Sequence, residues 1–201
     1  MMKNRAEPGF PPRLTRKAQL LILSVLFAAA GNPASAGDWP TWRYDPGRSG
    51  NSPEAAPSKL LLQWSRSWPA LEPAYRSARL QFDAGYEPII MKDLLFLASS
   101  RTDSVTALQL EDGTRAWRFY ADGPVRFAPV ADGERVYFGA DDGFLYCLDA
   151  SSGKLEWKFR AAPSTRRLLG NGRMISAWPI RGGPVLKDGK IYFAAGVWSF
   201  E

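Results

Sequence analysis

Apolar and polar residues alternate along the chain in short runs, and tight-turn signals separate the runs. In one run Leu155, Trp157 and Phe159 share a face and charged residues lie between them, which is the period of a half-buried strand. Asp-Gly pairs favour tight turns because glycine accepts a positive φ. No helical period appears after residue 36, so the sequence predicts an all-β fold. The Asp-Gly pairs stand at 112–113, 122–123, 132–133, 142–143 and 188–189.

The runs repeat with a period of 40: residues 105–119 align with 145–159 without a gap, and a third copy begins at 184–193. Such a period, built of short strands, is typical of β-propeller blades, each a four-stranded antiparallel sheet. We expect about two and a half blades, whereas a closed ring needs about four to eight, so the chain is interpreted as a truncated fragment. The expected strands are 87–92, 94–99, 104–110 and 115–120, then 128–131, 135–140, 144–149 and 155–160, with a lone strand near 60–68 because 62–64 resembles 155–157.

The first 36 residues have the composition of a secretory signal peptide. A basic segment precedes the mostly apolar run 18–30, and Ala34-Ser35-Ala36 offers small residues to a signal peptidase. The apolar run would rise only about 20 Å as a helix, short of a hydrocarbon core of about 30 Å. We therefore expect export to the periplasm or the extracellular space, with no membrane span after signal removal. The expected divisions are 1–36 (signal peptide), 37–86 (N-terminal extension), and blades at 87–127, 128–182 and 183–201, the last truncated.

Charge and composition exclude several classes of function. The chain carries 26 Lys+Arg and 20 Asp+Glu, a formal net charge of +6. Five of these bases and one acid lie in the signal peptide, which leaves 21 and 19, or +2, with no basic stripe for a nucleic acid. Histidine, the commonest general base and metal ligand, is absent. Cys147 is the only cysteine, so no intrachain disulfide can form, and on an apolar strand we expect a buried, unreactive thiol.

The repeats resemble the tryptophan-docking motif of the quinoprotein (PQQ-dependent) alcohol dehydrogenases and their non-catalytic relatives, roughly Ala-x-Asp-x-x-Thr-Gly-x-x-x-Trp. The opening, residues 38–50, also resembles the start of secreted PQQ-like repeat proteins. The resemblance implies a propeller in which Trp117 and Trp157 each pack between adjacent blades. The first copy keeps Ala107, Gly113 and Trp117 but has Gln109 and Asp112, and the second keeps Asp149, Gly153 and Trp157 but has Cys147 and Ser152.

Candidate ligand-binding residues lie in two places, each with a structural alternative. The inter-blade segment 161–181 is about fifteen residues longer than its counterpart after the first blade; as a loop over the channel mouth it could bind an anionic or planar ligand, or it could be a solvated insertion. Charged residues just before the innermost strands could line the central channel, or be turn-end charges. These candidates are Arg166, Arg167, Arg173, Trp178 and Arg181 in the first place, and Glu87, Arg126 and Arg181 in the second.

Two motifs with glycine are assigned no chemistry. Residues 141–143 read Asp-Asp-Gly, but no spaced oxygen ligands follow as a calcium loop requires, so we expect a hairpin turn. Residues 170–172 read Gly-Asn-Gly and lack both the third glycine and the strand–helix context of a phosphate cradle.

The sequence favours an exported, non-catalytic propeller that binds a protein, glycan or small-molecule ligand in the cell envelope, with no cofactor evident. The alternative is a fragment of a PQQ-dependent dehydrogenase, which would hold PQQ and calcium. No catalytic or metal-binding residue of such an enzyme can be placed here, and Cys147 lacks the adjacent cysteine that the family enzymes commonly carry. A third hypothesis, a scaffold resembling the β-barrel assembly lipoprotein, is disfavoured because no cysteine near the cleavage site could carry a lipid.

Overall fold

The structure, a computed structural model, describes residues 37–56, 58–75, 83–170 and 172–196. The expected signal peptide, 1–36, lies outside the described residues. All the regular secondary structure in the described part is β, which confirms the all-β prediction. That part contains no helix with the length and apolarity to cross a membrane.

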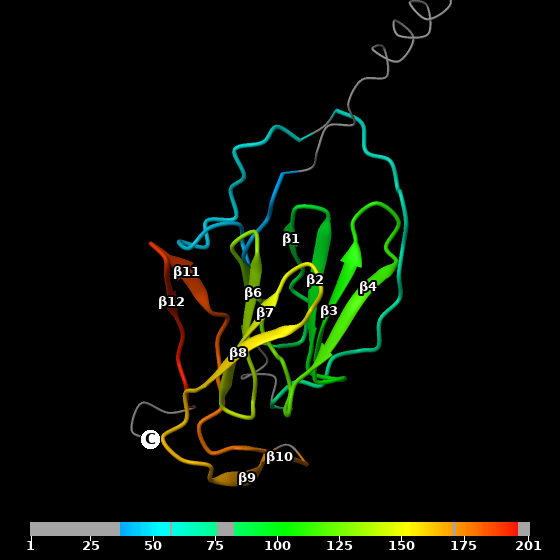
Figure 1. The fold of residues 1–201 in the computed structure, drawn as a ribbon. Helices are drawn as coiled ribbons and strands as arrows, with labels where there is room; N and C mark the ends of the chain where they lie inside the picture. Colours follow the sequence, from blue (N-terminus) through cyan, green and yellow to red (C-terminus); the bar gives the residue numbers. More distant parts are fainter. Residues whose placement is uncertain (1–36, 57, 76–82, 171, 197–201) are drawn as a thin grey trace, which may run out of the picture. The chain divides into compact units, whose positions relative to one another are not determined.

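Two four-stranded antiparallel sheets make up most of the fold, each with its strands in chain order (Figure 1). Their bounds differ from the predicted ones by two residues at most, because the alternation and the Asp-Gly turns determine where each strand begins and ends. Four-stranded meanders of this kind are the blades that the 40-residue repeat predicted. The first sheet is β1 (Ile89–Met91), β2 (Leu94–Ser99), β3 (Ser104–Gln109) and β4 (Arg115–Tyr120); the second is β5 (Val130–Ala131), β6 (Arg135–Gly139), β7 (Phe144–Asp149) and β8 (Leu155–Arg160).

The repeated tryptophan follows a shift of register at the same place in both sheets. Trp117 pairs with Ala107 and Trp157 with Cys147, and the register between outer strand and neighbour shifts immediately beside each pair. A bulge of this kind bends the outer strand and increases its twist. The identical position in both blades means that the repeat encodes the bulge together with the tryptophan.

The first sheet packs against the second through aromatic side chains. Phe119 of β4 lies edge-on to Phe138 and Tyr146, with ring centroids 6.1 and 5.6 Å apart, and Phe138 stacks on Tyr146 at 5.0 Å. Edge-to-face and offset pairs at these separations are favourable arrangements of aromatic rings. Phe138 and Tyr146 belong to one buried apolar cluster that spans both blades, and the partly buried Phe119 packs against it, so the two sheets share a core.

A two-stranded start of a third blade covers only the inner part of the second sheet. Leu186 and Ile191, from β11 (Val185–Lys187) and β12 (Lys190–Tyr192), pack against a cluster of Val130, Tyr137 and Cys147. No described strand covers the outer part of that sheet. Apolar side chains of β8 are exposed there, and the exposed fractions are 39% for Leu155, 40% for Trp157 and 55% for Phe159.

The segment 38–48 runs along the inner strands of the first two blades and reaches the start of the third. Trp39 and Ile90 of β1 exchange two backbone hydrogen bonds of 2.8 and 2.9 Å, and the Pro40 carbonyl accepts from Ala131 of β5 at 2.9 Å. The Arg48 guanidinium donates to the Gly183 carbonyl at 3.0 Å. The opening segment therefore satisfies backbone groups at the edges of β1 and β5 that the sheets leave unpaired.

Two sequence predictions differ from the structure. Residues 60–68 form no ladder with any described strand, so within the described part of the chain the segment lacks the hydrogen-bonded neighbour that a strand requires. The inter-blade insertion, expected as an irregular loop, contains the antiparallel hairpin β9 (Arg167–Gly170) and β10 (Arg173–Ser176). Its strands are only four residues long, too short for the alternation to be distinguished from that of a loop.

Candidate functional site

Arg126 and Asp141 form the centre of a buried ion-pair cluster, where the segment before β5 meets the turn between β6 and β7. Arg126, which precedes β5, donates through Nε to Asp141 at 2.7 Å and through Nη1 to Asp83 at 2.8 Å. The same Nη1 also donates to the Glu72 carbonyl at 2.6 Å. The two carboxylate side chains are fully buried and the Arg126 side chain is 3% exposed. Charges buried to this degree require partners, and here the arginine and the two carboxylates supply them to one another.

Arg181 joins the same cluster from the segment before β11. Its Nε and Nη2 donate to the two oxygens of Asp141 at 2.9 and 3.1 Å, the two-point contact that a planar guanidinium makes with a carboxylate. The guanidinium lies 5.9 Å from the centre of the Tyr75 ring. Among the described residues, the buried Nη1 of Arg181 has no hydrogen-bond acceptor. The structure thus brings together two of the predicted channel residues, Arg126 and Arg181, through an aspartate that the sequence analysis had assigned only to a hairpin turn.

Arg173 anchors the β9–β10 hairpin to the first blade. Its guanidinium pairs with the Asp103 carboxylate and donates to the Ser100 carbonyl at 3.2 Å, and it lies 3.8 Å from the Glu72 carboxylate. Burial raises the pKa of Asp103, and the hydrogen bond from Arg173 opposes this rise. The role of this residue in the structure is therefore to hold the insertion in place.

Two further candidates, Glu87 and Trp178, lie apart from this cluster. Glu87, before β1, accepts a 3.0 Å hydrogen bond from the backbone of Ala128, so it joins the entries of the first two blades. Burial is the main cause that raises the pKa of Glu87. Trp178 is half-buried, and its backbone N–H donates to the Ser176 hydroxyl at 3.1 Å. Neither residue contributes a side chain to the Arg126–Asp141 cluster.

Two tryptophans, Trp64 and Trp117, are each covered by the blade that follows, and the indole of each lies against a glycine of that blade. The Trp117 indole donates to the Ala150 carbonyl at 2.9 Å, and a Cβ at Gly153 would come within 2.5 Å of its ring. Trp64, in the N-terminal extension, repeats this geometry on the first blade: it donates to the Leu110 carbonyl at 2.9 Å and leaves 2.7 Å to a Cβ at Gly113.

Trp157 differs from these two because no described blade covers its outer side. It is half exposed, and its ring lies 6.0 Å from that of Tyr137 in the same sheet. Of the two tryptophans that the resemblance assigned to blade docking, only Trp117 lies between two described blades.

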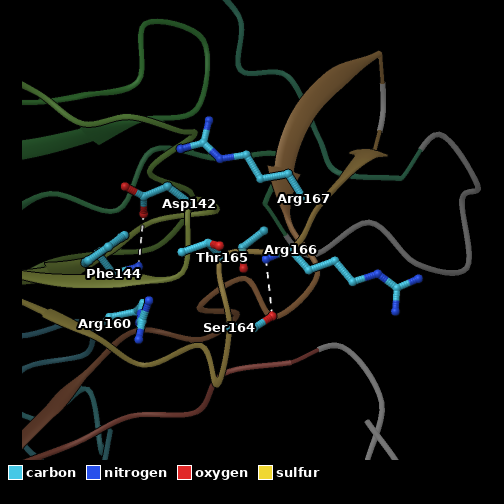
Figure 2. Close-up of a pocket in the computed structure, with 8 residues that line it drawn as sticks. Asp142, Phe144, Arg160, Ser164, Thr165, Arg166 and Arg167 are labelled. Carbon is cyan, nitrogen blue, oxygen red and sulfur yellow. Dashed lines mark hydrogen bonds between the residues drawn. The ribbon is translucent and has the colours of Figure 1, made fainter.

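A small pocket lies between the second blade and the β9–β10 hairpin. Its volume is about 50 Å³, enough for a group of a few heavy atoms. Figure 2 shows Arg160 and Arg167 beside Asp142 and Thr165, whereas the side chain of Arg166 points away. The full lining is Asp142, Phe144, Arg160, Ser164, Thr165, Arg166, Arg167 and Ser176.

The charges of this pocket are unbalanced in favour of cations. Asp142 accepts hydrogen bonds from the Phe144 backbone at 3.0 Å and from the Tyr146 hydroxyl, and burial raises the pKa of its carboxyl. Arg160 and Arg167 form no ion pair with any acid in the described part of the chain. Two free guanidinium groups therefore flank one carboxylate that is already occupied, and the pocket offers donors to an anionic group.

The buried carboxylates do not fit the calcium ion of a quinoprotein centre. Both Asp83 and Asp141 are occupied by Arg126, and Asp83 also accepts from the backbone of Ala74 at 2.9 and 3.1 Å. A cation at either carboxylate would have to displace an arginine. Within the described ranges, no three side chains of His, Cys, Asp or Glu gather as ligands for one ion.

Sequence reasoning missed the acidic half of the cluster and one side of the pocket. The turn 140–143 forms as predicted, with Gly143 donating to the Ala140 carbonyl at 3.1 Å, but the turn explanation accounted for Asp141 without revealing its ion pairs. Asp83 lies in the extension, outside the repeat, and Arg160 ends a strand as an ordinary exposed residue. No pattern in a single sequence connects these positions, because only the packing of blades and insertion brings them together.

The comparisons with known proteins agree with a propeller. The model of one family, described as outer membrane protein assembly factor BamB, matches residues 42–196. The search of curated proteins returned no match.

Among solved structures, the chain is similar to quinohemoprotein alcohol dehydrogenase from Comamonas testosteroni, with 21% identity and a TM-score of 0.57 over 83% of this chain and 24% of the other. It is also similar to BamB from Moraxella catarrhalis, with 24% identity and a TM-score of 0.41 over 54% of this chain and 29% of the other. The chain thus spans less than a third of the length of either protein. The likeness to the dehydrogenase supports the fold alone.

Proposed function

The chain belongs to the family described as outer membrane protein assembly factor BamB, and we propose that it is an exported, non-catalytic propeller module that binds a partner protein in the cell envelope. The family match over residues 42–196 carries the proposal, because the described role of that family is to assist in assembling other proteins. An assembly factor acts by binding, and a β-propeller offers a rigid scaffold for loops that do so.

The chemistry of the site supports binding rather than catalysis. Arg126, Arg181 and Asp141 neutralise one another in a buried cluster, so their charges stabilise the junction of the blades. A catalytic acid or base would need contact with a substrate and a pKa close to the working pH. The arginines free to meet a ligand, Arg160 and Arg167, are permanent cations, which bind anions but do not exchange protons near neutral pH.

Export is tested with a reporter enzyme that is active only outside the cytoplasm. Residues 1–201 fused to alkaline phosphatase are expected to give activity in cells, and a matched fusion that lacks the apolar run 18–30 is expected to give none. Equal activity of the two fusions would contradict export by this segment.

Binding and catalysis are separated by two measurements on the same protein. Chemical cross-linking in an envelope fraction, followed by mass spectrometry, is expected to yield a defined protein partner. Dye reduction with alcohols or sugars, in the presence of added PQQ and calcium, is expected to stay at the background rate. Quinone-dependent turnover would instead favour the alternative, a fragment of a PQQ-dependent dehydrogenase, and would refute the non-catalytic assignment.

A further inference from the structure

One face of the β9–β10 hairpin places an exposed apolar pair next to the arginine pocket. Arg167 pairs directly with Ser176, and Leu169 pairs with Met174. Because side chains alternate along a strand, these four residues lie on the same face of the hairpin. The Arg167–Ser176 pair forms part of the pocket wall, and the Leu169–Met174 pair lies two residues closer to the hairpin turn. Leu169 is 72% exposed and Met174 55% exposed, so the apolar pair is open to a partner.

The opposite side of the hairpin is fixed to the body of the protein. Ile175 is buried, Arg173 pairs with Asp103, and the Ser176 backbone donates to the Asp141 carbonyl at 2.8 Å. A further backbone bond of 2.9 Å joins Ala177 to Arg166. The apolar pair is therefore held on an anchored element, which reduces the entropy that binding would cost.

Charge and spacing together define what fits this face. Asp142 is the one acid among the residues that line the pocket, and it forms no ion pair with Arg160 or Arg167, so the charges of both arginines are unmatched there. The pocket volume of about 50 Å³ suits a carboxylate. Successive residues on one side of an extended peptide are about 7 Å apart, the same spacing as between the Arg167–Ser176 and Leu169–Met174 pairs. A free phosphate or an acidic sugar would satisfy the arginines but would bury no apolar surface on Leu169 and Met174.

We propose that this face docks an extended acidic peptide segment of a partner protein, with a carboxylate between Arg160 and Arg167 and an apolar side chain, two residues along, on Leu169 and Met174. This inference rests on the proposed function in that the partner is a protein. It adds the place of contact and the pattern that the partner must carry.

The test measures binding of a fluorescein-labelled peptide that repeats Glu-Ser-Leu-Ser to the full chain by fluorescence anisotropy, because in this repeat each leucine lies two residues after a glutamate and on the same side of the extended peptide. The double variant Arg160→Gln/Arg167→Gln is expected to bind at least about tenfold more weakly, as for loss of charge-assisted hydrogen bonds worth about 1.5–3 kcal/mol. Leu169→Ser is expected to weaken binding about fivefold, from lost apolar burial of about 1 kcal/mol. Arg115→Gln, which removes an exposed arginine on β4, is the matched control and is expected to change nothing.

A second peptide, with glutamine in place of glutamate, completes the design. It is expected to bind the unaltered chain about as weakly as the glutamate peptide binds the double variant, and to lose nothing further in that variant. Equal binding of the two peptides, or binding unaffected by the double variant, would overturn the docking site. Inorganic phosphate and polygalacturonate are tested as competitors that displace the labelled peptide. If either displaced it at a lower concentration of anionic groups than the unlabelled peptide requires, the site would be assigned to that anion and not to a peptide.

The outcome is separable from that of the proposed function. Quinone-dependent turnover would refute the non-catalytic assignment whatever the peptide does. Retained cross-linking to an envelope protein in the Arg160→Gln/Arg167→Gln variant would refute only the docking site, because the partner would then bind elsewhere on the chain.

Discussion

Substitution of Gly153 by alanine tests how the blades dock on each other. Gly153 has a φ of +69°, and an added Cβ would lie 2.5 Å from the Trp117 ring. Alanine in that backbone conformation costs about 1 kcal/mol, and overpacking against the indole adds about 1–3 kcal/mol. We therefore expect a loss of about 2–4 kcal/mol in the free energy of unfolding, on the same two principles.

Gly189 provides a matched control, because it has the same φ of +69° and nothing within 4 Å of its added Cβ. Gly189→Ala should therefore show the backbone cost of about 1 kcal/mol without the clash. Urea unfolding followed by far-UV circular dichroism gives both values and does not depend on tryptophan fluorescence.

A double-mutant cycle assigns the difference to the indole. In a Trp117→Ala background the ring is gone, so the cost of Gly153→Ala should fall to that of Gly189→Ala. Gly113→Ala, opposite Trp64, should behave like Gly153→Ala because its Cβ would lie 2.7 Å from that ring. If Gly153→Ala cost no more than Gly189→Ala, the inference that this glycine exists to admit the tryptophan would be refuted.

Two further predictions concern buried groups. Asp141→Asn should lower the free energy of unfolding by about 3–5 kcal/mol, because it leaves two buried arginines without their shared carboxylate. The control Glu156→Gln, in the exposed pair with Arg135, should lower it by less than about 1 kcal/mol. Equal melting temperatures of the two variants would contradict the stabilising role of the buried cluster. Burial raises the pKa of Cys147 from 9.0 to about 12. The native thiol should therefore resist iodoacetamide at pH 9, while the urea-unfolded thiol reacts. The contribution of the buried neutral thiol to stability should be complete below pH 9 and be lost as the pH rises from 9 through about 12. Rapid native alkylation would contradict this burial.

The strands and the repeat follow from local chemistry, which a single sequence records. Alternation identifies the strand from Leu155 to Arg160, and the turn chemistry of Asp142 and Gly143 marks where β6 ends and β7 begins. These signals depend only on neighbours along the chain, and for that reason both blades were predicted within two residues. The same reasoning failed at 60–68, where Trp64 has the motif but no described strand pairs with the segment.

The exposure of a residue and its charge partners depended on the tertiary structure. Trp117 and Trp157 occupy the same place in the repeat, yet the first is 9% exposed and the second 40%, because only the first is covered by another described blade. Arg126 and Arg181 were recognised as candidates from their positions, but Asp83 and Asp141 lie 43 and 15 residues from Arg126 in sequence. The sequence alone determined the strands of the blades, because strands and turns depend on residues that are neighbours along the chain. The ion pairs and the pocket were determined only by the tertiary structure, because they join segments that lie far apart in the sequence.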